Sequence, residues 1–285
     1  MTVKEVMVIG AGQMGAGIAL VFARSGYQVK LYDTDIEALK RGRQYVEQIL
    51  EKDMAKGKIE ADTKSEALDR LQPVVDLEAD PITADFIIEA VVEKMDVKKE
   101  VFRKLDELAP AHSLFATNTS SLAITEMAAV TNRAEQFIGM HFMNPVPVMK
   151  LVEIIRGLET SEDTCQTVKE LTEALGKQGV EVKDFPGFVS NRLLMPMINE
   201  AVYTVFEGIS SIEDVDQVMK LGMNHRMGPL ELADFIGLDT CVSIMEILHE
   251  GFGDSKYSPC PLLRQYVQAG RLGKKAGRGF YTYND

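Results

Sequence analysis

Hydrophobic positions in the first two thirds of the chain fall into two alternating patterns. Short continuous runs of apolar residues are typical of strands buried in a parallel sheet, and apolar positions that recur every three or four residues are typical of helices. Strands and helices that alternate in this way predict an α/β domain. The predicted strands are residues 6–9, 28–32, 73–76, 85–90, 113–117, 137–143, 150–155 and 180–183.

Two regions depart from this simple alternation. Residues 36–70 hold two consecutive helical patterns joined near 56–59, which predicts a helical hairpin inserted after the second strand and standing off the sheet. From residue 186 onwards the pattern is helical only, so we expect two domains, 1–185 and 186–285, of which the second is all-α. The apolar surface of such a helical domain favours a homodimer formed through it. Its expected helices are 189–206, 212–219, 230–235, 241–248 and 262–267.

The strongest local motif follows the first strand directly. Residues 6–9 lead into GAGQMG at positions 10–15. The helical pattern follows the glycines directly, with apolar positions at Ile18, Ala19, Phe22 and Ala23. In such a strand–turn–helix unit, Gly10 permits the sharp turn, Gly12 lets a pyrophosphate approach the backbone, and Gly15 lets the helix pack on the strand. The N–H groups at the helix start would bind the phosphates, which predicts a Rossmann-type dinucleotide-binding domain. The expected contacts are Gly10, Gly12, Gln13, Met14 and Gly15.

An acidic residue stands where such a domain needs one. The second strand, residues 28–32, ends at Asp33, 18 residues after Gly15. A carboxylate there accepts hydrogen bonds from the adenosine ribose hydroxyls and repels a 2′-phosphate, which favours NAD over NADP. The alternative is a glycine turn with a structural role only.

Composition restricts the partners. The 285 residues include 31 Lys and Arg against 43 Asp and Glu, a formal net charge of −12. This balance argues against nucleic acid or an anionic membrane as the main partner, because both bind basic faces, and an anionic substrate would need a local basic cluster. Residues 1–5 lack the apolar region of a signal peptide, and no apolar run is long enough for a membrane span. Three cysteines without metal-ligand spacing indicate free thiols, so we expect a cytoplasmic protein without a metal.

A second candidate site lies on two apolar strands, residues 137–143 and 150–155. The linker between them, residues 144–149, is too short for the crossover of roughly a dozen residues that a parallel pair needs, so the strands are predicted to be antiparallel neighbours. A turn at the middle of this linker pairs His141 with Glu153. A carboxylate without a partner in an apolar strand is costly. A bond from His141 would satisfy it and raise the basicity of the other ring nitrogen; the alternative is a buried pair without chemistry.

Other polar side chains have two interpretations each. Lys52 and Lys56 share one helix face, which is either a solvated surface or a basic site. Glu93 and Lys98 follow the fourth strand, at the edge where open α/β sheets bind ligands, and are either cofactor contacts or a surface ion pair.

The chain offers two further candidates. Ser120 and its neighbour Ser121 either cap the next helix or face the ligand. Asn191 begins an apolar stripe and either bonds its own backbone or points into the cleft between the domains.

With these residues in view, the chain resembles the short-chain L-3-hydroxyacyl-CoA dehydrogenase family over essentially its whole length, with most likeness to the bacterial 3-hydroxybutyryl-CoA branch. Met143 stands where most members of the family have phenylalanine, an apolar exchange that leaves the role of the neighbouring histidine intact. The resemblance is carried by the glycine turn and by residues 118–122, 141–153, 186–192 and 277–281.

The resemblance implies a role for each matching position. His141 would be the catalytic base, Glu153 its orienting acid, and Ser120 and Asn191 the hydrogen-bond donors around the reacting oxygen. The family's helical C-terminal domain also forms its dimer. The implied NAD contacts are Asp33, Glu93, Lys98, Ser120, Asn144 and Lys275, and the implied CoA contacts are Lys52 and Lys56.

We therefore expect NAD-dependent oxidation of a short-chain (S)-3-hydroxyacyl-CoA at C3, to a 3-ketoacyl-CoA, within fatty acid metabolism. Two alternatives stay open. One is an NAD-dependent sugar-acid dehydrogenase of the L-gulonate type, against which Lys52 and Lys56 favour CoA. The other is a non-catalytic NAD-binding structural protein, against which the complete set of His141, Glu153 and the two donors argues.

Overall fold

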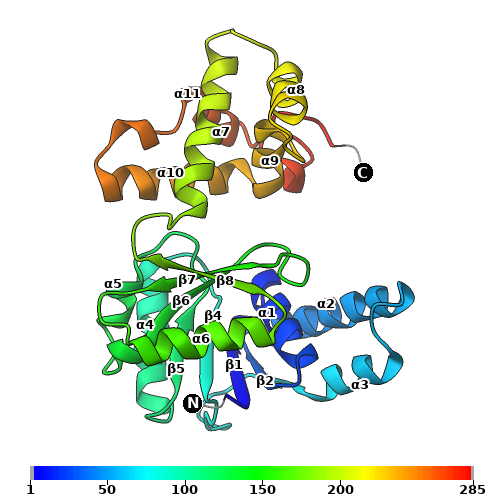
Figure 1. The fold of residues 1–285 in the computed structure, drawn as a ribbon, viewed down its shortest axis with the longest axis vertical. Coiled ribbons are helices and arrows are strands. Elements are labelled where there is room, and N and C mark those ends of the chain that lie inside the picture. The colour runs from blue at the N-terminus through cyan, green and yellow to red at the C-terminus, as the bar shows by residue number, and fades with distance from the viewer. Residues whose placement is uncertain (1–2, 284–285) are drawn as a thin grey trace. The chain divides into compact units, whose positions relative to one another are not determined.

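The computed structural model of the chain describes residues 3–283. Met1 and Thr2, which belong to the segment that lacks a signal-peptide pattern, lie outside the described residues. The chain divides into two compact units, Met1–Asp184 and Phe185–Asp285 (Figure 1). The first contains the sheet and the second contains only helices and irregular segments, as the change of pattern near residue 186 predicts.

One eight-stranded sheet forms the centre of the N-terminal unit, with the strand order β3-β2-β1-β4-β5-β6-β7-β8. All eight expected strands are present, and β3 begins two residues earlier than predicted. Neighbouring strands are parallel except β6 and β7, which confirms the antiparallel pair predicted from the short linker. The bounds are β1 Glu5–Ile9, β2 Gln28–Tyr32, β3 Leu71–Val74, β4 Phe86–Glu89, β5 Leu114–Thr117, β6 Phe137–Phe142, β7 Leu151–Arg156 and β8 Gln178–Lys183.

Helices cover both faces of this sheet, and its central strands β4, β5 and β6 are buried on both sides. Helices α1 and α6 share one core with Val6, Val8 and other sheet residues. Helix α4 packs on the opposite face, where the Phe102 ring lies 4.5 Å from that of Phe137 and 5.9 Å from that of Phe115, between ring centroids. The helices are α1 Gln13–Arg24, α2 Ile36–Ala55, α3 Ala61–Asp69, α4 Met95–Leu108, α5 Ile124–Ala128 and α6 Glu162–Ala174, with a short 3-10 helix at Ala134–Gln136.

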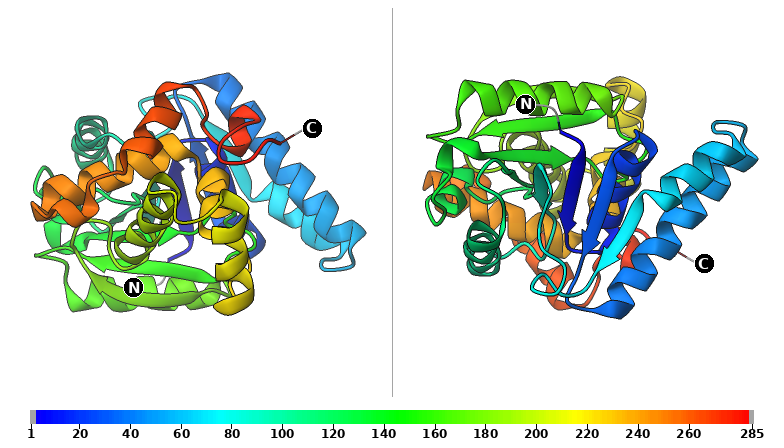
Figure 2. Two further views of the ribbon diagram at one scale, coloured as in Figure 1. Left: turned by 90° about the horizontal axis from the view of Figure 1, so that it is seen from above. Right: turned by 90° about the horizontal axis from the view of Figure 1, so that it is seen from below.

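The insertion after β2 is a helical hairpin, as the pattern predicts. The first turns of α2 pack against the sheet domain through Leu39 and Gly42, and the hairpin formed with α3 then extends away from the sheet (Figures 1 and 2). Lys52 and Lys56 lie towards the projecting end of α2, where both side chains are exposed. The hairpin thus presents both lysines to solvent.

The C-terminal unit has a core of its own, built by five helices. Two buried carboxylates tie its last segment to these helices: Asp234 accepts bonds of 2.9 Å each from the N–H groups of Phe280 and Tyr281, and Asp216 accepts one of 2.8 Å from the Tyr281 hydroxyl. The helices are α7 Ser190–Phe206, α8 Ile212–Gly222, α9 Pro229–Ile236, α10 Leu238–Phe252 and α11 Pro261–Gln268, with 3-10 helices at Ser255–Tyr257 and Lys274–Ala276.

The three cysteines, Cys165, Cys241 and Cys260, are free thiols buried in the two cores, as their spacing predicts. Burial raises the pKa of each thiol, that of Cys241 to about 12. Among residues 3–283, no helix combines the length and the apolar character that crossing a membrane requires.

Candidate active site

The glycine turn between β1 and α1 has the geometry that its spacing predicts. Gly10 has a φ of +100°, and a Cβ added there would lie 2.8 Å from the Ala90 carbonyl oxygen. A Cβ on Gly15 would come within 1.8 Å of the Gly10 carbonyl oxygen, so α1 crosses the turn too closely for any side chain. A Cβ on Gly12 would meet no atom within 4 Å. Gly12 therefore leaves open space beside the backbone, and the other two glycines make the close turn possible.

That open space belongs to a groove of 790 Å³ at the carboxyl ends of β1, β2 and β4. Gly12, Asp33 and Val92 line it, and α4 forms its far wall. No side chain among residues 3–283 caps the first turn of α1, so its N–H groups and positive dipole end face a ligand position. Asp33 is held in place by bonds from the N–H groups of Ala11 (2.8 Å) and Asp35 (3.0 Å), and a carboxylate keeps further acceptor positions for ribose hydroxyls. The groove fits a dinucleotide.

His141 and Glu153 face each other across β6 and β7. The register pairs them directly, which confirms the pairing predicted from the linker length. Their side chains join through His141 Nδ1 and Glu153 Oε2, 2.9 Å apart, and both residues are buried, with 6% and 2% of their surface exposed. Because a carboxylate only accepts, the proton of the neutral ring sits on Nδ1 and the lone pair on Nε2. The arrangement makes Nε2 a base held in one orientation.

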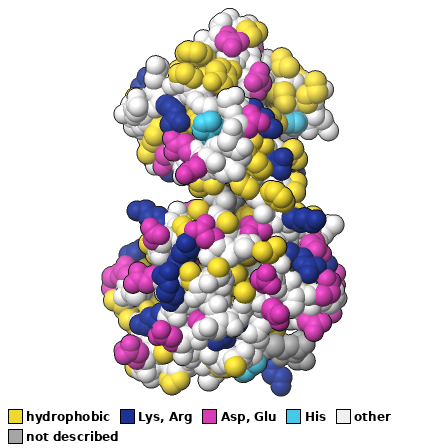
Figure 3. Space-filling model, turned by 90° about the vertical axis from the view of Figure 1, so that its left-hand side faces the viewer, with side chains coloured by type: hydrophobic (Ala, Val, Ile, Leu, Met, Phe, Trp, Pro, Cys, Tyr) yellow, Lys and Arg dark blue, Asp and Glu magenta, His cyan; other side chains and the backbone are white. Residues whose placement is uncertain are grey.

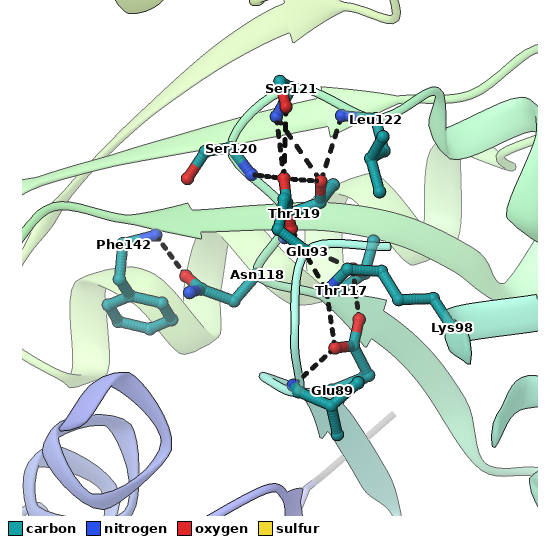
Figure 4. Close-up of polar contacts among 11 residues, drawn as sticks. Glu89, Glu93, Lys98, Thr117, Asn118, Thr119, Ser120, Ser121, Leu122 and Phe142 are labelled. Carbon is teal, nitrogen blue, oxygen red and sulfur yellow. Dashed lines mark hydrogen bonds and ion pairs between the residues drawn. The ribbon is translucent and has the colours of Figure 1, made fainter. Parts of the chain in front are cut away.

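The last residue of β5 and the loop that follows it, together residues 117–122, lie around the carboxylate of Glu93 (Figure 4). Glu93 Oε1 accepts bonds from the Thr119 hydroxyl at 2.6 Å and from the N–H groups of Ser120 and Ser121 at 2.8 and 3.2 Å. This contact brings two expected site residues, Glu93 and Ser120, together. Glu93 lies in the connection between β4 and α4, so a side chain from that connection holds the backbone of Ser120 in place.

The helix-capping alternative for Ser120 and Ser121 is wrong. Asp184 instead accepts the N–H groups of Ile124 and Thr125 at the start of α5, at 3.0 and 2.7 Å. Its carboxylate comes from the end of β8, about sixty positions along the chain, so no local pattern could reveal it.

Lys98 is paired with two carboxylates. It pairs with Glu93 at 3.3 Å, but its ammonium is 1% exposed and lies closer, at 2.6 Å, to Glu89 Oε1 (Figure 4). The Lys98–Glu89 pair is thus buried, and the surface ion pair predicted for Lys98 is wrong on the lysine side, whereas Glu93 keeps 37% of its side chain exposed. Sequence reasoning missed Glu89, although it is an acid within an apolar strand, the same signal that pointed to Glu153.

Two asparagines lie near the His141 strand. Asn118 Oδ1 accepts the N–H of Phe142, the residue after His141, at 2.8 Å. Asn144 Oδ1 accepts a bond from Gln13 Nε2 at 3.4 Å, so two expected cofactor contacts from distant segments meet at the glycine turn. Asn118 was not among the expected site residues. Its position directly after β5 could have indicated it, because ligands of open α/β sheets bind at the carboxyl ends of the strands.

The remaining expected residues lie elsewhere. Asn191 is the second residue of α7, is buried, and donates its N–H to the Gly187 carbonyl at 3.1 Å. Lys275 lies in the 3-10 helix Lys274–Ala276 and bonds Asp239 Oδ2 at 2.8 Å. Both belong to the C-terminal unit. Lys52 and Lys56 form no ion pair with any residue between 3 and 283.

Comparisons with known proteins cover both units. A family model described as "3-hydroxyacyl-CoA dehydrogenase, NAD binding domain" matches residues 5–185, and one described as "3-hydroxyacyl-CoA dehydrogenase, C-terminal domain" matches residues 187–283. The chain is 59% identical over 286 residues to a probable 3-hydroxybutyryl-CoA dehydrogenase of Bacillus subtilis (strain 168), covering 100% of this chain and 99% of that one. It is 43% identical to the mitochondrial hydroxyacyl-coenzyme A dehydrogenase of Homo sapiens, covering 99% and 91%.

A solved structure agrees with these matches. The crystal structure of (S)-3-hydroxybutyryl-CoA dehydrogenase from Ralstonia eutropha superposes with a TM-score of 0.95 at 46% sequence identity, covering 100% of both chains. The likeness therefore extends to the fold of both units.

Proposed function

This chain belongs to the 3-hydroxyacyl-CoA dehydrogenase family, and we propose that it converts (S)-3-hydroxybutyryl-CoA and acetoacetyl-CoA into one another with NAD and NADH. It is an NAD-dependent oxidoreductase with a Rossmann-type unit followed by a helical one. The observation that carries the proposal is the buried His141–Glu153 pair in the same unit as the dinucleotide groove. Neither the sugar-acid dehydrogenase nor the non-catalytic protein is favoured by the comparisons.

The groove supplies the cofactor site. The N–H groups from Gly12 to Gly15 would hold the pyrophosphate, and Asp33 would accept the ribose hydroxyls. When bound, NAD supplies the acceptor for a hydride from C3 of the substrate. Further contacts in the proposal are Gly10, Glu93, Lys98, Ser120, Asn144 and Lys275.

The protein's own chemistry is proton transfer at His141. Nε2 removes the proton from the 3-hydroxyl of the substrate, and Glu153 stabilises the imidazolium that results. In the opposite direction the same nitrogen returns the proton to the oxygen. Positioned acid–base catalysis of this kind contributes typically ~10²–10⁴ in rate.

Other residues bind and orient the substrate. Ser120 and Asn191 would donate hydrogen bonds to the reacting oxygen, which carries developing negative charge during hydride transfer. Lys52 and Lys56 would meet the phosphates of CoA, and their exposed position on the hairpin, with no acid paired to either among residues 3–283, supports this role.

The proposal extends to assembly and location. We infer a homodimer formed through the C-terminal unit, a cytoplasmic location and a place in fatty acid metabolism. Support for the dimer comes from apolar side chains exposed on the C-terminal unit, Leu221 and Val218 of α8 among them. Figure 3 shows one face of this unit, on which further hydrophobic side chains are exposed. The location and the metabolic role rest on the sequence and the resemblance.

The deciding experiment follows nicotinamide absorbance in two reactions. With acetoacetyl-CoA and NADH the absorbance should fall rapidly, and with L-gulonate and NAD it should stay constant. Turnover of gulonate alone would replace the proposal by the sugar-acid activity. NADH binding without turnover of either substrate would support a non-catalytic protein.

A further inference from the structure

We propose, on the premise of the proposed function, that Glu89 is a positioning residue that sets the place of Ser120. Glu89 is the last residue of β4 and is fully buried, so it does not touch the substrate. It acts on the loop of residues 117–122 through two separate chains of contacts, one through Lys98 and one through Thr117 (Figure 4).

The first chain of contacts is ionic. Glu89 Oε1 lies 2.6 Å from the ammonium of Lys98, which lies 3.3 Å from Glu93 Oε2. The other oxygen of Glu93 accepts the N–H of Ser120 at 2.8 Å. One ammonium is thus shared by two carboxylates, and the position of the second carboxylate decides where the Ser120 backbone lies.

The second chain of contacts uses hydroxyls. Glu89 Oε2 accepts the Thr117 hydroxyl at 2.7 Å, and the oxygen of that hydroxyl accepts the N–H of Thr119 at 3.3 Å. The Glu89 carbonyl also accepts the N–H of Asn118 at 2.8 Å. Three consecutive residues before Ser120 are therefore tied to Glu89, directly or through one intermediate atom.

The charges explain why the carboxylate is needed. Lys98 has two carboxylate partners among the described residues, Glu89 and Glu93, and the shorter contact is with Glu89. If Glu89 is neutral, the buried ammonium keeps only Glu93 as counter-charge and draws that side chain towards itself. Glu93 then leaves the N–H groups of the loop, and Ser120 loses its fixed position. An apolar side chain at position 89 would fill the space, but the Lys98 ammonium would then have Glu93 as its one carboxylate partner of the two.

The experiment compares Glu89→Gln with Asp106→Asn. Asp106 is a matched control because it also has a buried carboxylate paired with a cation, Arg133 at 2.6 Å, and it lies in the same unit without a bond to the loop. Glu89→Gln should lower kcat for acetoacetyl-CoA reduction about tenfold to a hundredfold, with KM for acetoacetyl-CoA little changed, because a small misplacement of a group that acts on the reacting oxygen is costly. Asp106→Asn should lower stability without changing kcat.

A double-mutant cycle separates positioning from general damage. If Glu89 acts through Ser120, Glu89→Gln should have little further effect on kcat in a Ser120→Ala background. Multiplicative losses, meaning the same fold-change in both backgrounds, would overturn the proposal. Thr117→Val removes only the second chain of contacts and should lower kcat in the same direction by a smaller factor, and it provides the cycle should Glu89→Gln not fold.

A readout that needs no activity completes the test. Hydrogen exchange of the Ser120 and Ser121 amides, followed by mass spectrometry of the peptide over 117–122, should speed up in Glu89→Gln and not in Asp106→Asn. Unchanged exchange would overturn the proposal whatever the kinetics. An inactive wild-type protein would instead overturn the proposed function, and the exchange result would still report on Glu89.

Discussion

Glu153 and Glu89 are both buried carboxylates in apolar strands, yet their partners give them different roles. Glu153 faces an imidazole at 2.9 Å, whose other ring nitrogen can accept a proton. Glu89 faces an ammonium at 2.6 Å, which has hydrogen-bond donors but no acceptor. The first pair can therefore take part in proton transfer, whereas the second can only fix geometry. At the residue scale, the group that pairs with a buried glutamate decides what that glutamate does.

The role of His141 is tested by His141→Gln. The variant should lose at least ~10²-fold in kcat, because glutamine offers no basic nitrogen, while NADH affinity stays the same. Stopped assays of turnover and NADH fluorescence titration measure the two quantities. His112→Gln is the matched control, since His112 is exposed and pairs with Asp85 at 3.4 Å. Normal turnover in His141→Gln would remove His141 from the mechanism.

At the scale of elements, two glycines in the segment from β1 to α1 serve different purposes: one is needed for folding and the other for ligand binding. Gly15 is required by the close crossing of helix and turn, where a Cβ would lie 1.8 Å from the Gly10 carbonyl oxygen. Gly12 has an ordinary φ of −65°, and nothing lies within 4 Å of an added Cβ. The fold does not require a glycine at position 12, so we infer that Gly12 leaves space for the ligand in the groove.

Alanine substitutions distinguish these two roles. Gly15→Ala should be strongly destabilised or fail to fold, because α1 must move away from the turn. Gly12→Ala should melt within a few degrees of the wild type but bind NADH roughly tenfold or more weakly, because the methyl group occupies space meant for the pyrophosphate. Thermal melting and NADH titration provide the measurements. Wild-type NADH affinity in Gly12→Ala would show that the pyrophosphate lies elsewhere.

For the whole molecule, exposed apolar side chains suggest a contact surface for the proposed second copy. Leu221, at the end of α8, is 80% exposed, and Val218 lies one turn before it on the same helix with 61% exposed. Two large apolar residues at this spacing form a stripe that a single chain leaves in water. The stripe supports an isologous dimer contact through the C-terminal unit.

A charge placed in this stripe should separate the subunits. Leu221→Asp is expected to run as a monomer in sedimentation at concentrations where the wild type has twice the mass of the chain, because a buried unpaired carboxylate opposes association. Leu158→Asp is the control, since Leu158 is also 80% exposed but belongs to the N-terminal unit. A wild-type protein that is monomeric, or a dimer that Leu158→Asp dissociates, would contradict this assignment.

The sequence by itself determined the features that depend on neighbours along the chain. All eight strands, the helical hairpin and the glycine turn follow from apolar periodicity and spacing, with differences of a few residues at ends such as α10, which runs from Leu238 to Phe252 and not from 241 to 248. The pairing of His141 with Glu153 was predictable for the same reason. One short linker joins their strands, so chain length alone sets the register.

Only the tertiary structure decided which distant segments meet. Glu93 receives Ser120 from 27 positions away, and Glu89 receives Thr117 from 28 positions away. These contacts exist because β4 and β5 are neighbours in the sheet and α4 brings Lys98 between their ends. Strand order and helix packing arise from burial of surface by the whole domain, which acts on all elements together. The sequence pattern of one segment therefore does not predict which side chain of a distant segment will contact it.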